Sequence, residues 1–287
     1  RTNAMAQVVA IHGIGQQFKG EHELRAEWLP ALRDGLSRVG RAFPNEDDLV
    51  CAFYGDLFRE KGTKSLGDPP YDASDVCDEW ERELLELWWR EAARVEPPLP
   101  GPDAKTKLRT PKIVQRALNA LSNSEFFAGV AERVLIGDLK QVRSYLQDEE
   151  IHTKVQERVA KEVKKDTRIL IGHSLGSVVG YEALCAHPQW PIRTFVTLGS
   201  PLGIRNLIFD QLRPRPVRQV GSWPGNVKQW TNISDQGDIV ALVKELRPRF
   251  DGRVEDQLTY NGATAHDVKP YLSAEETGGA IARGLKS

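Results

Sequence analysis

The sequence is poor in cysteine and methionine. Its three cysteines, Cys51, Cys77 and Cys185, form an odd and unclustered set, which argues against both a disulfide framework and a zinc site. Unpaired thiols favour a reducing compartment, so we expect a cytoplasmic protein. The only methionine is Met5. We interpret it as the native start and residues 1–4 as a remnant of an expression tag.

Long apolar runs and net charge are also lacking. No run approaches the roughly 18 apolar residues that span a bilayer, and the first residues lack the basic-then-apolar pattern of a secretion signal. The formal net charge is −1 and is spread along the chain, which argues against nucleic acid or anionic lipid as a main partner. The 287 residues, 40% of them hydrophobic, are enough for one large domain without disulfide or metal staples.

What the chain does contain is an alternation of strand-like and helix-like segments. Short apolar runs at 7–11 and 49–54 enclose a segment with helical spacing at 22–39. The alternation resumes later, with strands expected at 167–171, 192–198 and 227–233 and with helices expected up to about 186 and at 273–286. Strands separated by helices favour parallel pairing. We therefore predict an α/β fold with a mostly parallel central sheet flanked by helices.

The middle of the chain breaks this alternation with a series of expected helices and no strand. These helices are predicted at 75–95, 111–122, 124–135, 138–147 and 149–164. We predict that residues 5–58 and 149–287 form the core and that residues 59–148 form a helical insertion or cap. The first of these helices carries Trp80, Trp88 and Trp89. Two interpretations are open for it: a lid over an acyl chain, or a helix that packs on its own domain.

The strongest chemical signal is Gly172-His173-Ser174-Leu175-Gly176, which follows a predicted buried strand and precedes a predicted helix. This context turns a common Gly-x-Ser-x-Gly pattern into a specific one. The serine of such a motif occupies a sharp and strained turn, and Gly172 and Gly176 keep side chains out of the crowded space around it. We predict Ser174 as a nucleophile.

A serine hydroxyl requires a base, and the base requires a carboxylate. His266 follows all the predicted strands and is the best candidate for the base. Asp235 and Asp238 both follow the 227–233 strand. We favour Asp238, because the apolar run after it is suited to pack the loop against the core. The resulting order of Ser, Asp and His along the chain is the one found in α/β-hydrolases.

Acyl transfer also requires donors to the oxyanion. One expected donor is the backbone amide of Leu175, which follows the nucleophile. The second is the amide of Ile14, which lies between Gly13 and Gly15 in the loop after the first strand. Neither a metal nor a cofactor is required by this set of groups.

Together these motifs resemble the lipase and esterase branch of the α/β-hydrolase superfamily. The resemblance covers roughly residues 6–58 and 165–287, and it includes the turn Gly199-Ser200-Pro201-Leu202, which is similar to that of lipases related to glycosylphosphatidylinositol inositol-deacylases. It implies hydrolysis of a small-molecule or lipid carboxylic ester through an acyl-enzyme, without a cofactor, and it supports Asp238 as the acid. An amidase or thioesterase with the same triad, or a non-catalytic binding module, remains an alternative. Neither the substrate nor the oligomeric state follows from the sequence.

Overall fold

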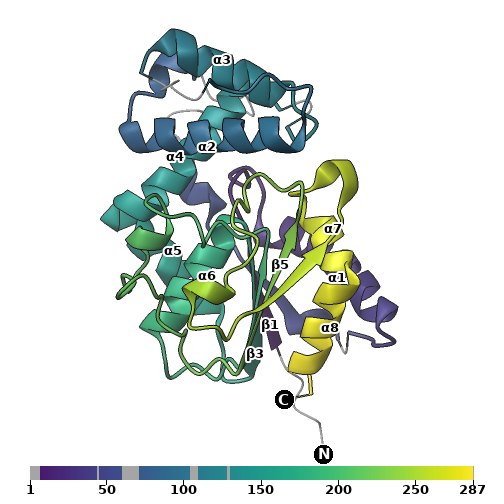
Figure 1. Cartoon of the computed structure of the whole chain (residues 1–287). Coiled ribbons are helices and arrows are strands. Elements are labelled where there is room, and N and C mark those ends of the chain that lie inside the picture. Colours follow the sequence, from purple (N-terminus) through teal and green to yellow (C-terminus); the bar gives the residue numbers. More distant parts are fainter. Residues whose placement is uncertain (1–6, 44, 60–70, 104–108, 128–129, 287) are drawn as a thin grey trace, which may run out of the picture.

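The computed structural model describes residues 7–43, 45–59, 71–103, 109–127 and 130–286. Its centre is a six-stranded sheet in which every neighbouring pair is parallel (Figure 1). The strands, in spatial order, are β2 (Leu49–Ala52), β1 (Gln7–Ile11), β3 (Thr167–His173), β4 (Thr194–Leu198), β5 (Gln229–Asp235) and β6 (Glu255–Thr259). The predicted α/β class is confirmed, and the sheet is entirely parallel rather than mostly so.

Helices cover both faces of the sheet, because alternate residues of each buried strand point to opposite sides. The face that bears Val8, Ala10 and Ile171 packs on α1 (Glu21–Arg38), α7 (Val268–Ser273) and α8 (Glu275–Gly284). The face that bears Val9, Ile11 and Leu170 packs on α5 (Glu149–Glu162) and α6 (Leu175–Ala186). The helix predicted at 273–286 is confirmed as α8, whereas the short α7 that precedes it is not among the predicted helices.

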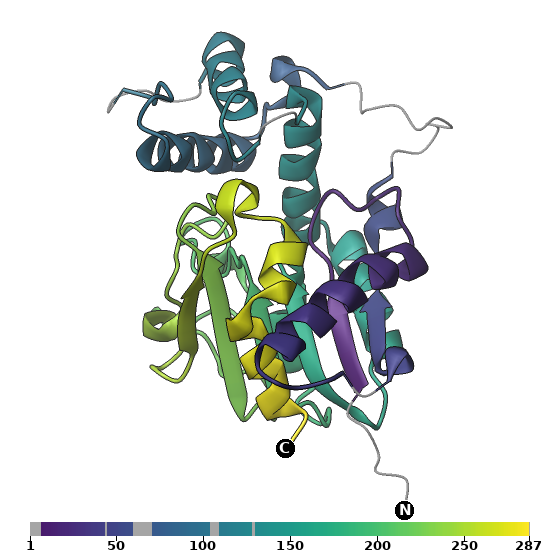
Figure 2. The same cartoon turned by 90° about the vertical axis from the view of Figure 1, so that its right-hand side faces the viewer.

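The middle segment is helical, as predicted, but its helix boundaries differ. The described part of this segment contains three helices before α5: α2 (Glu79–Val95), α3 (Pro111–Ser122) and α4 (Glu132–Gln147). The helix predicted at 124–135 is wrong, because Asn123 and Ser124 end α3. Their side chains donate to the carbonyls of Asn119 and Leu121 at 2.7 and 2.6 Å. Figure 2 shows α4 standing upright beside α2 and α3 and reaching down to the sheet layer.

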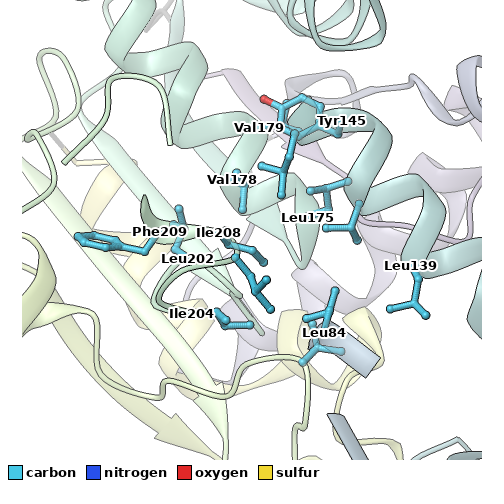
Figure 3. Packing of buried hydrophobic residues seen from close by; sticks show 14 of the residues in the cluster. Leu84, Leu139, Tyr145, Leu175, Val178, Val179, Leu202, Ile204, Ile208 and Phe209 are labelled. Atoms are coloured by element: carbon cyan, nitrogen blue, oxygen red, sulfur yellow. The ribbon is translucent and has the colours of Figure 1, made fainter. Parts of the chain in front are cut away.

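The inserted helices have no separate core in the part of the chain that the structure describes. One continuous apolar cluster joins Leu84 of α2 and Leu139 of α4 to Leu175 of α6 and to the buried face of the sheet. Figure 3 shows the same cluster extending to the loop after β4, from Leu202 to Phe209. Residues 1–4, predicted as a tag remnant, and residues 60–70 of the insertion lie outside the described residues.

Two further observations concern the cysteines and the possibility of a membrane-spanning helix. Cys51, Cys77 and Cys185 are all free. Among the described helices, none has the length and apolarity that a bilayer crossing requires.

Candidate active site

Ser174 occupies the junction between β3 and α6, and its backbone has φ 53° and ψ −129°. This conformation is sparsely populated for residues with a side chain. Its neighbours have little room: a Cβ on Gly176 would lie 2.2 Å from the carbonyl oxygen of Ile11, and one on Gly172 would lie 2.6 Å from that of Gly176. The predicted glycines therefore permit a close approach of β1, β3 and α6, which fixes the strained turn.

The side chain of His266 contacts Ser174 from the loop between β6 and α7. Its Nε2 lies 2.9 Å from Ser174 Oγ, and its Nδ1 lies 2.8 Å from Asp238 Oδ2. A carboxylate only accepts, so Nδ1–H donates to Asp238 and Nε2 is left to accept the hydroxyl proton of Ser174. The three predicted side chains thus form one continuous hydrogen-bonded chain.

The structure places Asp238, and not Asp235, beside His266. Asp238 is fully buried, and its Oδ1 accepts from the amides of Val240 and Ala241 at 2.9 and 3.1 Å. The Asp235 carboxylate instead accepts from the amides of Gly237 and Asn261, so it shapes the loop after β5.

The charge state of Asp238 follows from its surroundings. Burial, the largest single influence, raises the pKa of this carboxyl group, whereas the positive charge that His266 can carry and the hydrogen bond from His266 lower it. The nearby ammonium of Lys244 and the hydroxyl of Tyr271 act in the same direction, and together they hold the pKa of Asp238 below its ordinary value. The carboxylate is therefore ionised at neutral pH and is able to stabilise an imidazolium.

Tyr271 of α7 is a site residue that sequence reasoning missed. Its hydroxyl donates to Asp238 Oδ2 at 2.8 Å and accepts from the amide of Asp235 at 2.8 Å. Burial raises the pKa of Tyr271 well above its ordinary value, so the hydroxyl remains a donor. No local motif marks this tyrosine, because its role depends on α7 folding back over the loop after β5.

Two more histidines line the site, and both are held neutral. His12 accepts the amide proton of Tyr54 at Nε2 (3.1 Å) and lies 2.7 Å through Nδ1 from the carbonyl oxygen of Gly13. His173 donates through Nε2 to the carbonyl of His266 at 2.8 Å. Burial lowers the pKa of His12 to about 4 and that of His173 to about 3. Both imidazoles are neutral at pH 7, and their hydrogen bonds to backbone groups hold the loops around Ser174.

The predicted oxyanion donors, Ile14 and Leu175, lie beside Ser174 and line the same apolar slot. Within the described part of the chain, neither backbone N–H has a protein partner. The amide of Gly15, the residue after Ile14, donates to the side-chain oxygen of Gln141 at 3.1 Å. Gln141 belongs to α4, so an inserted helix holds the loop that carries Ile14. Sequence reasoning missed this contact, because it joins residues 126 positions apart.

Ser174 opens onto two spaces of different character. A cavity of about 370 Å³ is lined by Ser174 and His266 together with Trp88 and Asp138 from the inserted helices. The second is an apolar slot of only about 10 Å³, lined by Ile14, Leu84, Trp88, Val142, Ser174, Leu175, Pro201, Ile204, Ile208 and Val240. A larger cavity of about 690 Å³ contains none of Ser174, His266 or Asp238, so we do not assign the chemistry to it.

Comparison of this chain with protein families, with curated proteins and with solved structures finds no match. The assignment of a function therefore depends on the geometry of the site.

Proposed function

We propose that this protein is a serine hydrolase of the α/β-hydrolase type that cleaves a carboxylic ester through an acyl-enzyme. The observation that carries the proposal is the hydrogen-bonded chain from Ser174 through His266 to Asp238, on a serine with a positive φ between a buried strand and a helix. The all-parallel sheet and the order Ser, Asp, His support the same proposal.

In the proposed acylation step, His266 Nε2 takes the hydroxyl proton as Ser174 Oγ attacks the ester carbonyl carbon. The oxyanion that forms would accept hydrogen bonds from the amides of Leu175 and Ile14. The imidazolium then gives its proton to the alcohol oxygen as the C–O bond breaks, which leaves an acyl group on Ser174. Water, activated by the same histidine, releases the acid and restores the serine hydroxyl.

The test is labelling with a fluorophosphonate, read as an added mass on the intact protein. We expect one phosphonyl group on the wild type and none on Ser174→Ala. Labelling should be at least about a hundredfold slower in His266→Ala, because the hydroxyl loses its base. Ser37→Ala, which changes an exposed serine of α1, is the matched control and should be labelled like the wild type.

The same experiment separates the two candidate acids. Asp238→Asn should slow labelling strongly, whereas Asp235→Asn should change it far less, because only Asp238 contacts His266. Labelling that persists in Ser174→Ala, or a folded wild type that takes no label, would contradict the proposal and favour a binding module.

A panel of an ester, an acyl thioester and a peptide then decides between leaving groups, since the same three side chains serve all of them. We expect the ester to be cleaved with the highest kcat/KM. A higher value for the peptide or the thioester would replace the proposed substrate class while leaving the mechanism in place.

A further inference from the structure

Asp138 is an acid in the active-site cavity that the proposed mechanism does not use. It belongs to α4, and it lines the same cavity of about 370 Å³ as Ser174 and His266. Its Oδ1 is sealed from solvent and has no hydrogen-bond partner among the described residues. Gln141, one turn further along α4, has its side-chain oxygen occupied by the amide of Gly15. The two side chains thus face the same loop, but only one of them is satisfied there.

The carboxyl group also lies close to the loop that carries Ile14. A Cβ on Gly15 would lie 3.7 Å from Asp138 Oδ1, which is ordinary van der Waals contact. Asp138 therefore lies against the loop of Ile14 and Gly15 and lines the same cavity as Ser174. A substrate held at Ser174 would extend past it.

The other charged groups of the cavity do not neutralise Asp138. Lys19 is bound by both carboxylate oxygens of Glu27 at 2.7 Å. The Asp267 carboxylate accepts from the backbone amide of Lys269 at 3.0 Å as the N-cap of α7, and no ion pair among the described residues joins the Lys269 ammonium to Asp138. Burial accordingly raises the pKa of Asp138 to about 7. The Asp138 side chain is half-buried and its sealed Oδ1 lacks a partner, which is costly, and such carboxyl groups in a cleft mark functional sites more often than chance.

We propose that Asp138 binds a positively charged amine on the alcohol part of the ester substrate. A protonated amine in the cavity carries the charge opposite to that of the half-buried carboxylate, and a charge-assisted hydrogen bond to its accessible side is the strongest pairing open to this group. The alcohol part is assigned to this cavity because the alternative space beside Ser174 is a small apolar slot that suits a short acyl group. This inference rests on the proposed esterase function and deepens it.

The experiment compares acetate esters of dimethylamino-alcohols, with spacers of two to five carbons, with their uncharged carbon isosteres. For the best spacer at pH 8, we expect the wild type to cleave the charged ester with a kcat/KM at least about tenfold higher than that of its isostere. Asp138→Asn and Asp138→Leu should bring this ratio close to one. Asp267→Asn, which changes another acid of the cavity wall, one that caps α7, should keep it.

The pH dependence gives a readout that a merely structural role would not produce. The preference for the charged ester should increase as the pH rises through about 7, because Asp138 ionises there while the amine remains protonated. A preference that is independent of pH, or that persists in Asp138→Asn, would overturn the inference.

Calorimetric titration of Ser174→Ala with the same esters separates this inference from the proposed function. If the isosteres are cleaved without any preference for charge, the inference fails and the esterase stands. If no ester is cleaved, tighter binding of the charged ester to Ser174→Ala would still support the role of Asp138, and equal binding would overturn it.

Discussion

The carboxylate of Asp238 is fixed on both of its oxygens. Two backbone amides hold Oδ1, while His266 and the hydroxyl of Tyr271 share Oδ2. The loop amides set the plane of the carboxylate, and Tyr271 limits its rotation toward or away from the imidazole. A carboxylate held in this way keeps His266 in the tautomer that accepts the serine proton, which makes Tyr271 a positioning residue.

Tyr271→Phe removes this hydroxyl while preserving the ring. We expect fluorophosphonate labelling to become about tenfold slower, which corresponds to the loss of one hydrogen bond to a charged group. Tyr181→Phe is the matched control, because Tyr181 also loses a buried hydroxyl, one that donates to the carbonyl of Ser222 at 2.9 Å, away from Asp238. It should cost stability without slowing the label. Equal slowing in both variants would show a general loss of packing instead.

Asp138 also predicts how stability depends on pH. Its carboxyl group titrates near 3.8 in the unfolded chain and near 7 in the folded one. Between these values the folded protein binds more protons, so the ionisation of Asp138 destabilises the fold as the pH rises from about 4 to about 7 and adds no further loss above that. Asp138→Asn has no such loss. We expect it to exceed the wild type in free energy of unfolding by about 1–3 kcal/mol at pH 8, a value reduced from the full shift because the side chain is only half-buried.

Urea unfolding at pH 4, 6 and 8 measures this difference, with Asp34→Asn on the exposed side of α1 as the control. The advantage of Asp138→Asn should grow with pH, and that of the control should stay near zero. An advantage that shrinks as the pH rises would contradict the burial of an unpaired carboxyl group.

At the scale of single residues, the sequence predicts the site residues that lie in local motifs or follow a known chain order, and it misses those that depend on contacts between distant segments. Ser174 lies in a local motif, and His266 and Asp238 follow from their order along the chain, so all three are found without a structure. Tyr271 and Asp138 act through contacts between distant segments. Within α4, Asp138 lies three residues after Leu135 and four before Val142, both of them buried, so helical spacing puts it on the apolar side of the helix; only the fold shows that it faces the cavity.

At the scale of elements, α4 links the insertion to the candidate active site. The side-chain oxygen of Gln141 accepts from the amide of Gly15, and its side-chain nitrogen donates to Oε1 of Gln17 at 3.3 Å. Gly15 has φ 75°, so the loop needs an outside partner to hold this turn in one conformation. Since Ile14 is the adjacent residue, the register of α4 sets where its amide points.

Gln141→Leu therefore tests whether an inserted helix positions the oxyanion loop. We expect labelling to slow by about tenfold, because the loop amide loses its acceptor and the donor beside it becomes less well ordered. Gln141→Glu retains an acceptor and should recover much of the rate. Gln147→Leu, an exposed position at the end of the same helix, should leave the rate unchanged. A normal rate in Gln141→Leu would mean that the loop is ordered without α4.

The elements that sequence patterns predict well are those with a buried, regular pattern. The apolar runs of β1, β3 and β4 are found nearly at their observed bounds. By contrast, β6 is missed, because Glu255-Asp256-Gln257-Leu258-Thr259 lies at the edge of the sheet and no residue in it is fully buried. Edge strands that carry charge and polar side chains lack the apolar signal by which strands are recognised.

On the scale of the whole molecule, the insertion is part of the hydrophobic core. Trp80, Trp88 and Trp89 of α2 are all buried in the cluster that includes α6 and the sheet. This packing favours the second of the two interpretations of α2, a helix that packs on its own domain. Trp88 borders both spaces beside Ser174, whereas Trp89 borders neither and donates to the carbonyl of Pro100 at 2.7 Å.

Under the proposed esterase function, a fixed α2 would limit the length of the acyl group. The slot beside Ser174 has about 10 Å³ of free space, room for little more than a water molecule. We therefore expect the wild type to prefer acetyl or propionyl esters and to lose at least about tenfold in kcat/KM toward hexanoyl esters. Trp88→Leu should move the optimum toward acyl groups longer by about two carbons, because it enlarges the wall of the slot.

Trp89→Leu is the control for this shift. It removes a similar buried ring from the next position of α2, so both variants should lose about 2–4 kcal/mol of stability, but only Trp88→Leu should change the chain-length profile. The measurement is kcat/KM over esters of two to eight acyl carbons, made below the unfolding temperature of each variant. A wild type that already prefers octanoyl esters would require α2 to move away from Ser174 on binding. The apolar cluster would then have to open, and the insertion would act as a lid after all.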